Sequence, residues 1–170
     1  MSFCLLVLSG RSSQKSTVSV VDGLRVGLRQ LGFEEGKQFI LVIRDMKGDL
    51  KGTEEAARNL EREKVGLLYT TATNTTIAAK RATADIPIVF NAAVDPVALG
   101  LIESFAKPGG RFTGVYYLAS DLSGKRLEIL KEIVPKLRRV VTFYDPRYTA
   151  AVESSKLARE TAGAAGCRAC

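Results

Sequence analysis

The chain has 170 residues, of which 46% are hydrophobic and 25% charged, and these proportions are typical of a globular protein rather than a disordered or fibrous one. Its 25 basic residues outnumber 18 acidic ones, which gives a net charge of +7. The basic residues are scattered among acidic neighbours and form no run interleaved with aromatic residues, so we expect no nucleic-acid partner. Histidine is absent, which excludes a Ser-His-Asp mechanism, and the three cysteines supply too few ligands for a structural metal site.

Short apolar runs alternate with amphipathic stretches along the chain. This pattern predicts an α/β fold with a doubly wound parallel sheet and helices on both faces. The first run has neither the basic flank nor the length of a secretion signal, so we interpret it as a strand. The predicted strands cover residues 3–8, 39–44, 65–70, 86–90, 112–116 and 140–144.

Two helices are predicted before the third strand. The first carries apolar residues at helical spacing from Val21 to Leu31 and ends at Gly32, which can adopt a left-handed conformation. The second opens at Thr53, where a hydroxyl cap and the two glutamates that follow suit the positive end of a helix, and it continues through Leu60.

The strongest helix start in the sequence is Asp95-Pro96, because aspartate can cap free amides and proline fits the first helical position. The predicted helix carries Leu101, Ile102 and Phe105. Two further helices are expected, over residues 123–134 and 149–162. The first of these ends before a proline and the second ends in glycines.

The chemistry of a doubly wound fold lies at the carboxyl ends of its strands. Here those ends carry small, hydroxylic, amide and aromatic residues, which are typical of a binding cleft that holds an anionic group with backbone amides and helix N-termini. The candidate ligand-binding residues are Gly10, Ser12, Thr71, Thr73, Asn74, Asn91, Asp95 and Tyr117. The loop after the first strand lacks the second glycine of a P-loop, and no Gly-x-Gly-x-x-Gly turn occurs, so we expect neither a nucleotide cofactor nor a catalytic residue.

Residues 70–76 contain five threonines and an asparagine in one strand-to-helix turn. One hydroxyl is expected to cap the helix, and the others exceed what a cap requires, so a ligand contact is the favoured interpretation. Asp95 either caps a helix or binds a ligand ammonium. Of Tyr116 and Tyr117, strand alternation sends one side chain inward and leaves the other to stack on a ligand.

A block of motifs from residue 86 to residue 115 closely resembles the substrate-binding proteins of ABC transporters that serve tryptophan, tyrosine and related ligands. The matching segments are Ile86-Pro-Ile-Val-Phe90, Asp95-Pro-Val97, Gly100-Leu-Ile102, Lys107-Pro-Gly-Gly110 and Thr113-Gly-Val115. The resemblance continues upstream through Leu31-Gly-Phe33 and downstream through Gly124-Lys-Arg-Leu-Glu128.

The resemblance implies a type I periplasmic-binding-protein fold, in which two Rossmann- or flavodoxin-like lobes close on a ligand and dock on a membrane permease. Residues 1–117 would form the first lobe and residues 118–170 the crossover and the start of the second. Thr73 would hold a ligand carboxylate, with Asp95 for the amine and Tyr117 for the side chain. The chain departs from the family at Asn74, where a proline is usual, and at Arg111, where an asparagine is usual.

The expected function is therefore solute binding for an ABC transporter, with a small and amino-acid-like ligand that could be aromatic. The alternative is a cytoplasmic ligand-sensing or regulatory domain of the same fold, because no secretion signal is recognised. The family implies a periplasmic or extracellular location, whereas a chain without a signal would be cytoplasmic. Since the second lobe is short, residues 140–144 could fold back on the first lobe, or an open sheet edge could pair with another copy.

Overall fold

A computed structural model describes residues 3–9, 14–164 and 166–169, with side chains for residues 18–164, 166 and 167. A sheet of five strands has the order β2-β1-β3-β4-β5. The register is parallel from β2 through β1 and β3 to β4. This is the order of flavodoxin-like doubly wound folds, so the predicted fold class is confirmed. The strands are β1 (Phe3–Ser9), β2 (Phe39–Asp45), β3 (Leu67–Thr70), β4 (Ile88–Ala92) and β5 (Phe112–Tyr116).

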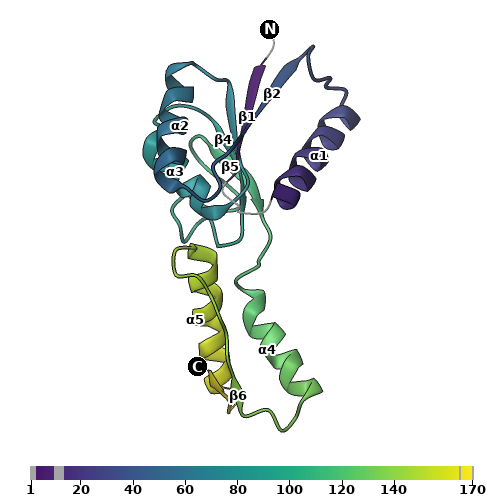
Figure 1. The fold of residues 1–170 in the computed structure, drawn as a ribbon, viewed down its shortest axis with the longest axis vertical. Coiled ribbons are helices and arrows are strands. Elements are labelled where there is room, and N and C mark those ends of the chain that lie inside the picture. The colour runs from purple at the N-terminus through teal and green to yellow at the C-terminus, as the bar shows by residue number, and fades with distance from the viewer. Residues whose placement is uncertain (1–2, 10–13, 165, 170) are drawn as a thin grey trace. The chain divides into compact units, whose positions relative to one another are not determined.

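Helices cover both faces of this sheet (Figure 1). On one face, α1 (Gln14–Gln30) packs Val21 against Phe39 and Leu41 of β2. On the other face, α2 (Leu50–Arg62) and α3 (Thr73–Ala82) cover a larger core that includes Leu60, Leu68, Ile88, Phe90 and Phe112. In β4 buried residues alternate with half-buried ones, so neither face of this strand is open to solvent, and it reads in the sequence as a mostly apolar run.

The end of α1 agrees with the sequence prediction, whereas the start of α2 does not. Gly32 is left-handed, with φ 83°, and the Phe33 amide donates to the Leu28 carbonyl at 2.9 Å, so α1 ends as predicted. The predicted start of α2 at Thr53 is wrong. Asp49 is the N-cap and accepts from the Gly52 amide at 3.1 Å, while the Thr53 hydroxyl donates back to the Asp49 carbonyl at 2.6 Å.

The helix predicted after Asp95-Pro96 is also wrong, because residues 96–106 form turns and bends. The Pro96 carbonyl accepts from the Leu101 amide at 2.8 Å, which closes a wide turn instead of extending a helical ladder. Gly100, with φ 62°, reverses the chain at this point. The cap-like dipeptide therefore begins a turn that buries Leu101 in the core.

Strand β5 lies next to β4 in the sheet, and the two strands come unusually close at Gly114 and Phe90. The Ile88 amide donates to the Arg111 carbonyl at 2.9 Å, and Gly114 lies against Phe90, so the two strands run in the same direction. A Cβ at Gly114 would stand 2.1 Å from the Phe90 carbonyl oxygen and 2.7 Å from its ring. Glycine is required here by the close approach of a neighbouring strand.

The chain divides into two compact units, and the second comprises Ala93–Asp95 and Tyr116–Cys170. Its small core brings Leu127, Ala162 and Cys167 together. The predicted helices are confirmed as α4 (Leu122–Ile133) and α5 (Thr149–Ala164). The predicted strand over residues 140–144 is wrong in extent, because only β6 (Arg139–Val140) forms, and it pairs in parallel with β7 (Arg168–Ala169) in a separate two-stranded sheet.

Candidate functional site

The strand order creates a switch point at the carboxyl ends of β1 and β3. Strand β1 is flanked by β2 on one side and β3 on the other, and its last residues pair as Ser9 with Asp45 and Leu8 with Thr70. From this position the chain leaves in opposite directions toward α1 and α3, and ligands of open α/β sheets bind in the crevice that results. Gly10 and Ser12, predicted to line this crevice, lie outside the described residues.

The turn from β3 into α3 is held by threonine hydroxyls. The Thr70 and Thr76 hydroxyls, both fully buried, hydrogen-bond each other at 2.8 Å. Thr76 also donates to the Ala72 carbonyl at 3.0 Å, which fixes the first helical turn to the end of the strand. The predicted hydroxyl cap is wrong, because the N-cap residue is Ala72, whose methyl side chain cannot accept a hydrogen bond. The positive end of α3 is therefore left without a capping oxygen from its own N-cap residue.

Three buried polar atoms near this turn have no hydrogen-bond partner among the described residues. They are Thr71 Oγ1, Thr75 Oγ1 and Asn91 Oδ1. Since Thr70 pairs with Phe90 in the β3–β4 register, Thr71 and Asn91 follow side by side at the ends of two neighbouring strands. A buried hydroxyl or amide without a partner costs about 1–3 kcal/mol, so such atoms cluster where something else binds.

Asn91 is oriented by Tyr69 of β3, which lies two residues before Thr71 in the chain. The two side chains hydrogen-bond, and burial raises the pKa of the Tyr69 phenol above its ordinary value, while the bond to Asn91 lowers it. The phenol is therefore neutral at pH 7 and acts as a fixed hydrogen-bonding group. The sequence interpretation missed Tyr69, because an aromatic residue in an apolar run indicates a core residue, and its closeness to Asn91 depends on the strand register.

The structure places the remaining predicted residues in two groups. Thr73 is buried and Asn74 half-buried in the first turn of α3, so both join Thr71 and Asn91 in the first unit. Asp95 and Tyr117 belong to the second unit, on two segments joined by a hydrogen bond from the Ser120 amide to the Ala93 carbonyl at 3.3 Å. Asp95 is half-buried and Tyr117 is 47% exposed.

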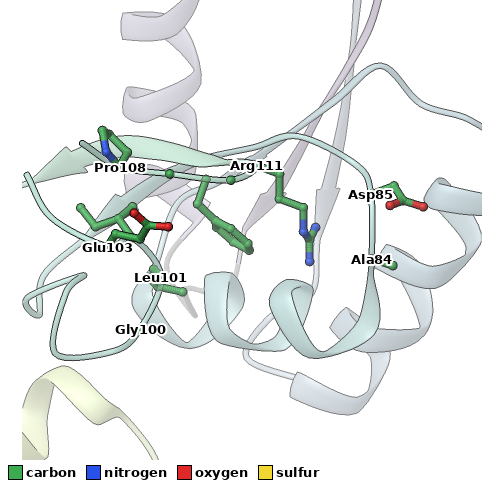
Figure 2. Close-up of a pocket in the computed structure, with 11 residues that line it drawn as sticks. Ala84, Asp85, Gly100, Leu101, Glu103, Pro108 and Arg111 are labelled. Carbon is green, nitrogen blue, oxygen red and sulfur yellow. The ribbon is translucent and has the colours of Figure 1, made fainter.

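A hollow of about 790 Å³ lies at the opposite edge of the same sheet, where β4 and β5 begin. Figure 2 shows Glu103 on one side of it, Asp85 on the other and Arg111 between them. The Arg111 guanidinium is already used: it donates to the Thr83 hydroxyl at 2.8 Å and the Ile86 carbonyl at 3.0 Å. Burial lowers the pKa of Arg111, and the group stacks 4.7 Å from the centre of the Phe112 ring. At this edge Arg111 is therefore used in hydrogen bonds that stabilise the fold, and none of the predicted ligand-binding residues lines the hollow.

Glu61 of α2 stabilises the same edge by binding the loop between α3 and β4. One of its carboxylate oxygens accepts the backbone amides of Ala84 and Asp85, both at 2.8 Å, and that of Ile86 at 3.2 Å. These hydrogen bonds, with the Asp85 amide the largest cause, hold the pKa of Glu61 below its usual value. Arg111, where the resemblance implies an asparagine, thus has a structural role, because it fixes the loop between α3 and β4.

Two searches of the described residues bear on other kinds of site. No cluster of three or more cysteine, aspartate or glutamate side chains within them could hold a metal ion. None of the described helices combines the length and the apolar character needed to cross a membrane.

The fold is that of doubly wound α/β proteins, which bind ligands at the carboxyl ends of their strands, and comparison with known proteins gives its family. The family of ABC transporter substrate binding proteins matches residues 10–168. The chain is 33% identical over 124 residues to the tyrosine-binding protein of Clostridioides difficile, covering 72% of this chain and 35% of that protein. The chain therefore belongs to the ABC transporter substrate-binding protein family, which is a family of binding proteins rather than enzymes.

Solved structures match nearly the whole chain. A conserved domain protein from Vibrio cholerae superposes with a TM-score of 0.89 at 28% identity, and an ABC domain from Streptococcus pneumoniae in complex with L-Trp superposes with a TM-score of 0.85 at 22% identity. Each match covers 99% of this chain and 56% of the other. The chain thus spans about half the length of these structures and about a third of the tyrosine-binding protein, which is 35% covered.

Proposed function

We propose that this chain supplies the first lobe, and the start of the second, of the solute-binding component of an ABC transporter. The ligand is an amino acid with an aromatic side chain, which the complete protein delivers to a membrane permease outside the cytoplasm. The relatives support this ligand class, since one is named for tyrosine binding and a similar structure contains L-Trp.

The observation that carries the proposal is the set of unpartnered polar atoms beside the N-terminus of α3. Thr71 Oγ1 and Asn91 Oδ1 are buried with no hydrogen-bond partner among the described residues, and the N-cap residue Ala72 has no side chain that could cap the helix. A hydroxyl, an amide oxygen and the positive end of a helix together suit a zwitterion, which presents a carboxylate and an ammonium within a few ångströms of each other. A purely apolar ligand would leave all of these groups unsatisfied.

The roles follow from this chemistry. The amides of the first turn of α3, with Thr73 and Asn74, bind the ligand carboxylate, and Thr71 donates its hydroxyl to the same group. Asn91, held by Tyr69, presents its carbonyl oxygen to a ligand N–H donor. Gly10 and Ser12 as lining residues, Asp95 as the partner of the ammonium and Tyr117 as the contact for the ligand ring stay predictions from the sequence.

The experiment is a ligand titration of the 170-residue chain followed by its melting temperature, with L-tyrosine and L-tryptophan as the first ligands. A ligand that binds only the native state raises the melting temperature as its concentration rises. L-Tyrosinamide is the matched control, because it keeps the ring and the ammonium and removes the carboxylate. We expect a clear rise with L-tyrosine and a smaller one with the amide.

Two results would count against the proposal in different ways. Equal shifts with L-tyrosine and L-tyrosinamide would remove the carboxylate from the N-terminus of α3 while leaving an aromatic site. A folded chain that responds to no amino acid at millimolar concentration would show that this lobe alone does not form the site.

A further inference from the structure

The side-chain amide of Asn91 is held in one orientation at the carboxyl end of β4. Its oxygen, Oδ1, is buried with no hydrogen-bond partner among the described residues, while the side chain hydrogen-bonds the Tyr69 phenol. Because the oxygen takes no part in that bond, the amide nitrogen donates to the phenol oxygen. The amide oxygen is therefore an interior acceptor of the first unit whose lone pairs are still available.

The strand register explains why Tyr69 can hold this amide. Tyr69 of β3 pairs with Val89 of β4 in the parallel register, and alternation along β4 places Asn91 on the same face as Val89. The Tyr69 side chain packs against the buried cluster that Val21 of α1 forms with β2. A ring that is packed on its apolar body and hydrogen-bonded at its hydroxyl restricts the rotation of the amide, so Tyr69 is a positioning residue for Asn91.

The acceptor lies close to the N-terminus of α3. Thr71 directly precedes the N-cap residue Ala72, and it stands beside Asn91 at the end of the neighbouring strand. Neighbouring strands are about 4.8 Å apart. A ligand carboxylate at the start of α3 therefore brings its α-ammonium, which is attached one carbon away, toward the amide oxygen of Asn91.

We propose that the amide oxygen of Asn91 accepts a hydrogen bond from the α-ammonium of the ligand, and that Tyr69 positions this oxygen. The inference rests on the proposed function, which places the ligand carboxylate at α3. It assigns the ammonium to the first unit, whereas the sequence prediction assigns it to Asp95 of the second. The ligand class narrows to carboxylic acids that also carry an ammonium, because an acid without one leaves the buried oxygen unsatisfied.

An amide oxygen suits this interior position better than a carboxylate does. A buried ion without a partner costs far more than a buried amide, so a carboxylate at position 91 would destabilise the chain before the ligand arrives. The amide still binds an ammonium well, because a hydrogen bond from a charged donor is about twice as strong as one between neutral groups. The site thus recognises a cation without holding an anion of its own.

The test compares L-tyrosine with 3-(4-hydroxyphenyl)propionate, which keeps the ring and the carboxylate and has hydrogen in place of the ammonium. Calorimetric titration of the 170-residue chain gives both affinities and their ratio. In the parent chain we expect L-tyrosine to bind about tenfold more tightly. Asn91→Leu has nearly the same shape and should bind the two compounds equally, because only L-tyrosine loses a hydrogen bond. Tyr69→Phe releases the amide and should lower the ratio about threefold.

Two further variants control this comparison. Asn91→Asp replaces the amide by a carboxylate of the same size, so it should raise the ratio above that of the parent chain, and it keeps the test informative if Asn91→Leu does not fold. Asn59→Leu is the matched control, because it makes the same substitution at an exposed position of α2 and should keep the ratio of the parent. Far-UV circular dichroism checks that each variant is folded.

Three results would overturn the inference. One is a parent chain that binds both compounds equally, and another is an Asn91→Leu variant that keeps the ratio of the parent. The third is a ratio that falls in Asp95→Asn and not in Asn91→Leu, which would assign the ammonium to Asp95. In each case a weaker response to L-tyrosinamide than to L-tyrosine would leave the carboxylate at α3, so the proposed function would survive. A chain that binds none of these compounds would overturn both.

Discussion

Replacing Thr71 by valine separates ligand binding from stability, because the two should change in opposite directions. Thr71 is buried, with 6% of the residue exposed, and its hydroxyl has no hydrogen-bond partner among the described residues. Valine has nearly the same shape and replaces only the hydroxyl by a methyl group. Thr71 precedes α3, so helix propensity does not enter the comparison.

The expected magnitude follows from the cost of an unsatisfied buried hydroxyl. Removing such a group recovers part of a desolvation penalty of about 1–3 kcal/mol, so Thr71→Val should raise the free energy of unfolding by about 1 kcal/mol in the absence of ligand. For a unit of this size the melting temperature should rise by about 4 °C. If the hydroxyl donates to the ligand, its loss should weaken binding about five- to tenfold.

Thr76→Val provides the contrast within the same turn. The Thr76 hydroxyl bonds the buried Thr70 hydroxyl at 2.8 Å, so valine at position 76 leaves Thr70 without a partner. We expect this variant to lose about 1–3 kcal/mol of stability. Because Thr76 uses its hydroxyl within the protein, no direct ligand contact is lost.

The assay is urea unfolding of the parent and both variants without ligand, followed by titration with L-tyrosine. The reasoning requires opposite signs for the two stability changes and weaker binding in Thr71→Val. If Thr71→Val is destabilised as much as Thr76→Val, the Thr71 hydroxyl has a partner inside the protein. If it is stabilised and still binds L-tyrosine as the parent does, the hydroxyl is buried but lies away from the ligand.

Three further predictions concern the frame that holds the site. Gly114→Ala should lower the free energy of unfolding by about 3 kcal/mol, because its Cβ would stand 2.1 Å from the Phe90 carbonyl oxygen, and an unchanged urea midpoint would show that the strands separate freely. Because the pKa of Glu61 is lowered in the folded protein, its carboxylate stabilises the fold at pH values above its ordinary pKa of 4.5. This contribution is lost as the pH falls through the lower pKa of the folded state. Glu61→Gln should therefore flatten the acid side of a plot of stability against pH, and equal slopes in both proteins would contradict this. Arg111→Lys keeps the positive charge but removes the planar guanidinium that donates to several acceptors at once, so the free energy of unfolding should fall by about 1–2 kcal/mol in thermal unfolding. A lysine variant as stable as the parent would mean that charge alone suffices.

Much of the fold was predictable because its signals are local or periodic. The predicted apolar runs coincide with β1 to β5, and Gly32 ends α1 at the residue where the sequence places a left-handed stop. The failures share a physical cause. Asp95-Pro96 has the chemistry of a helix start, but the turn closed at Gly100 draws Leu101 into the core, and tertiary packing overrides the local preference.

The sequence predicts a site at the carboxyl ends of the strands, and the structure brings Thr71, Thr73, Asn74 and Asn91 together in the first unit. The amino-acid sequence determined that threonines and amides follow the strands and that no histidine is available, since these are matters of composition and order. Only the tertiary structure decided which of those groups are satisfied. Thr70 and Thr76 have the same chemistry as Thr71, yet they hydrogen-bond each other, while the Thr71 hydroxyl has no partner among the described residues and Tyr69 hydrogen-bonds Asn91. Hydrogen bonding between strands and helices depends on register and burial, and a sequence read residue by residue contains neither.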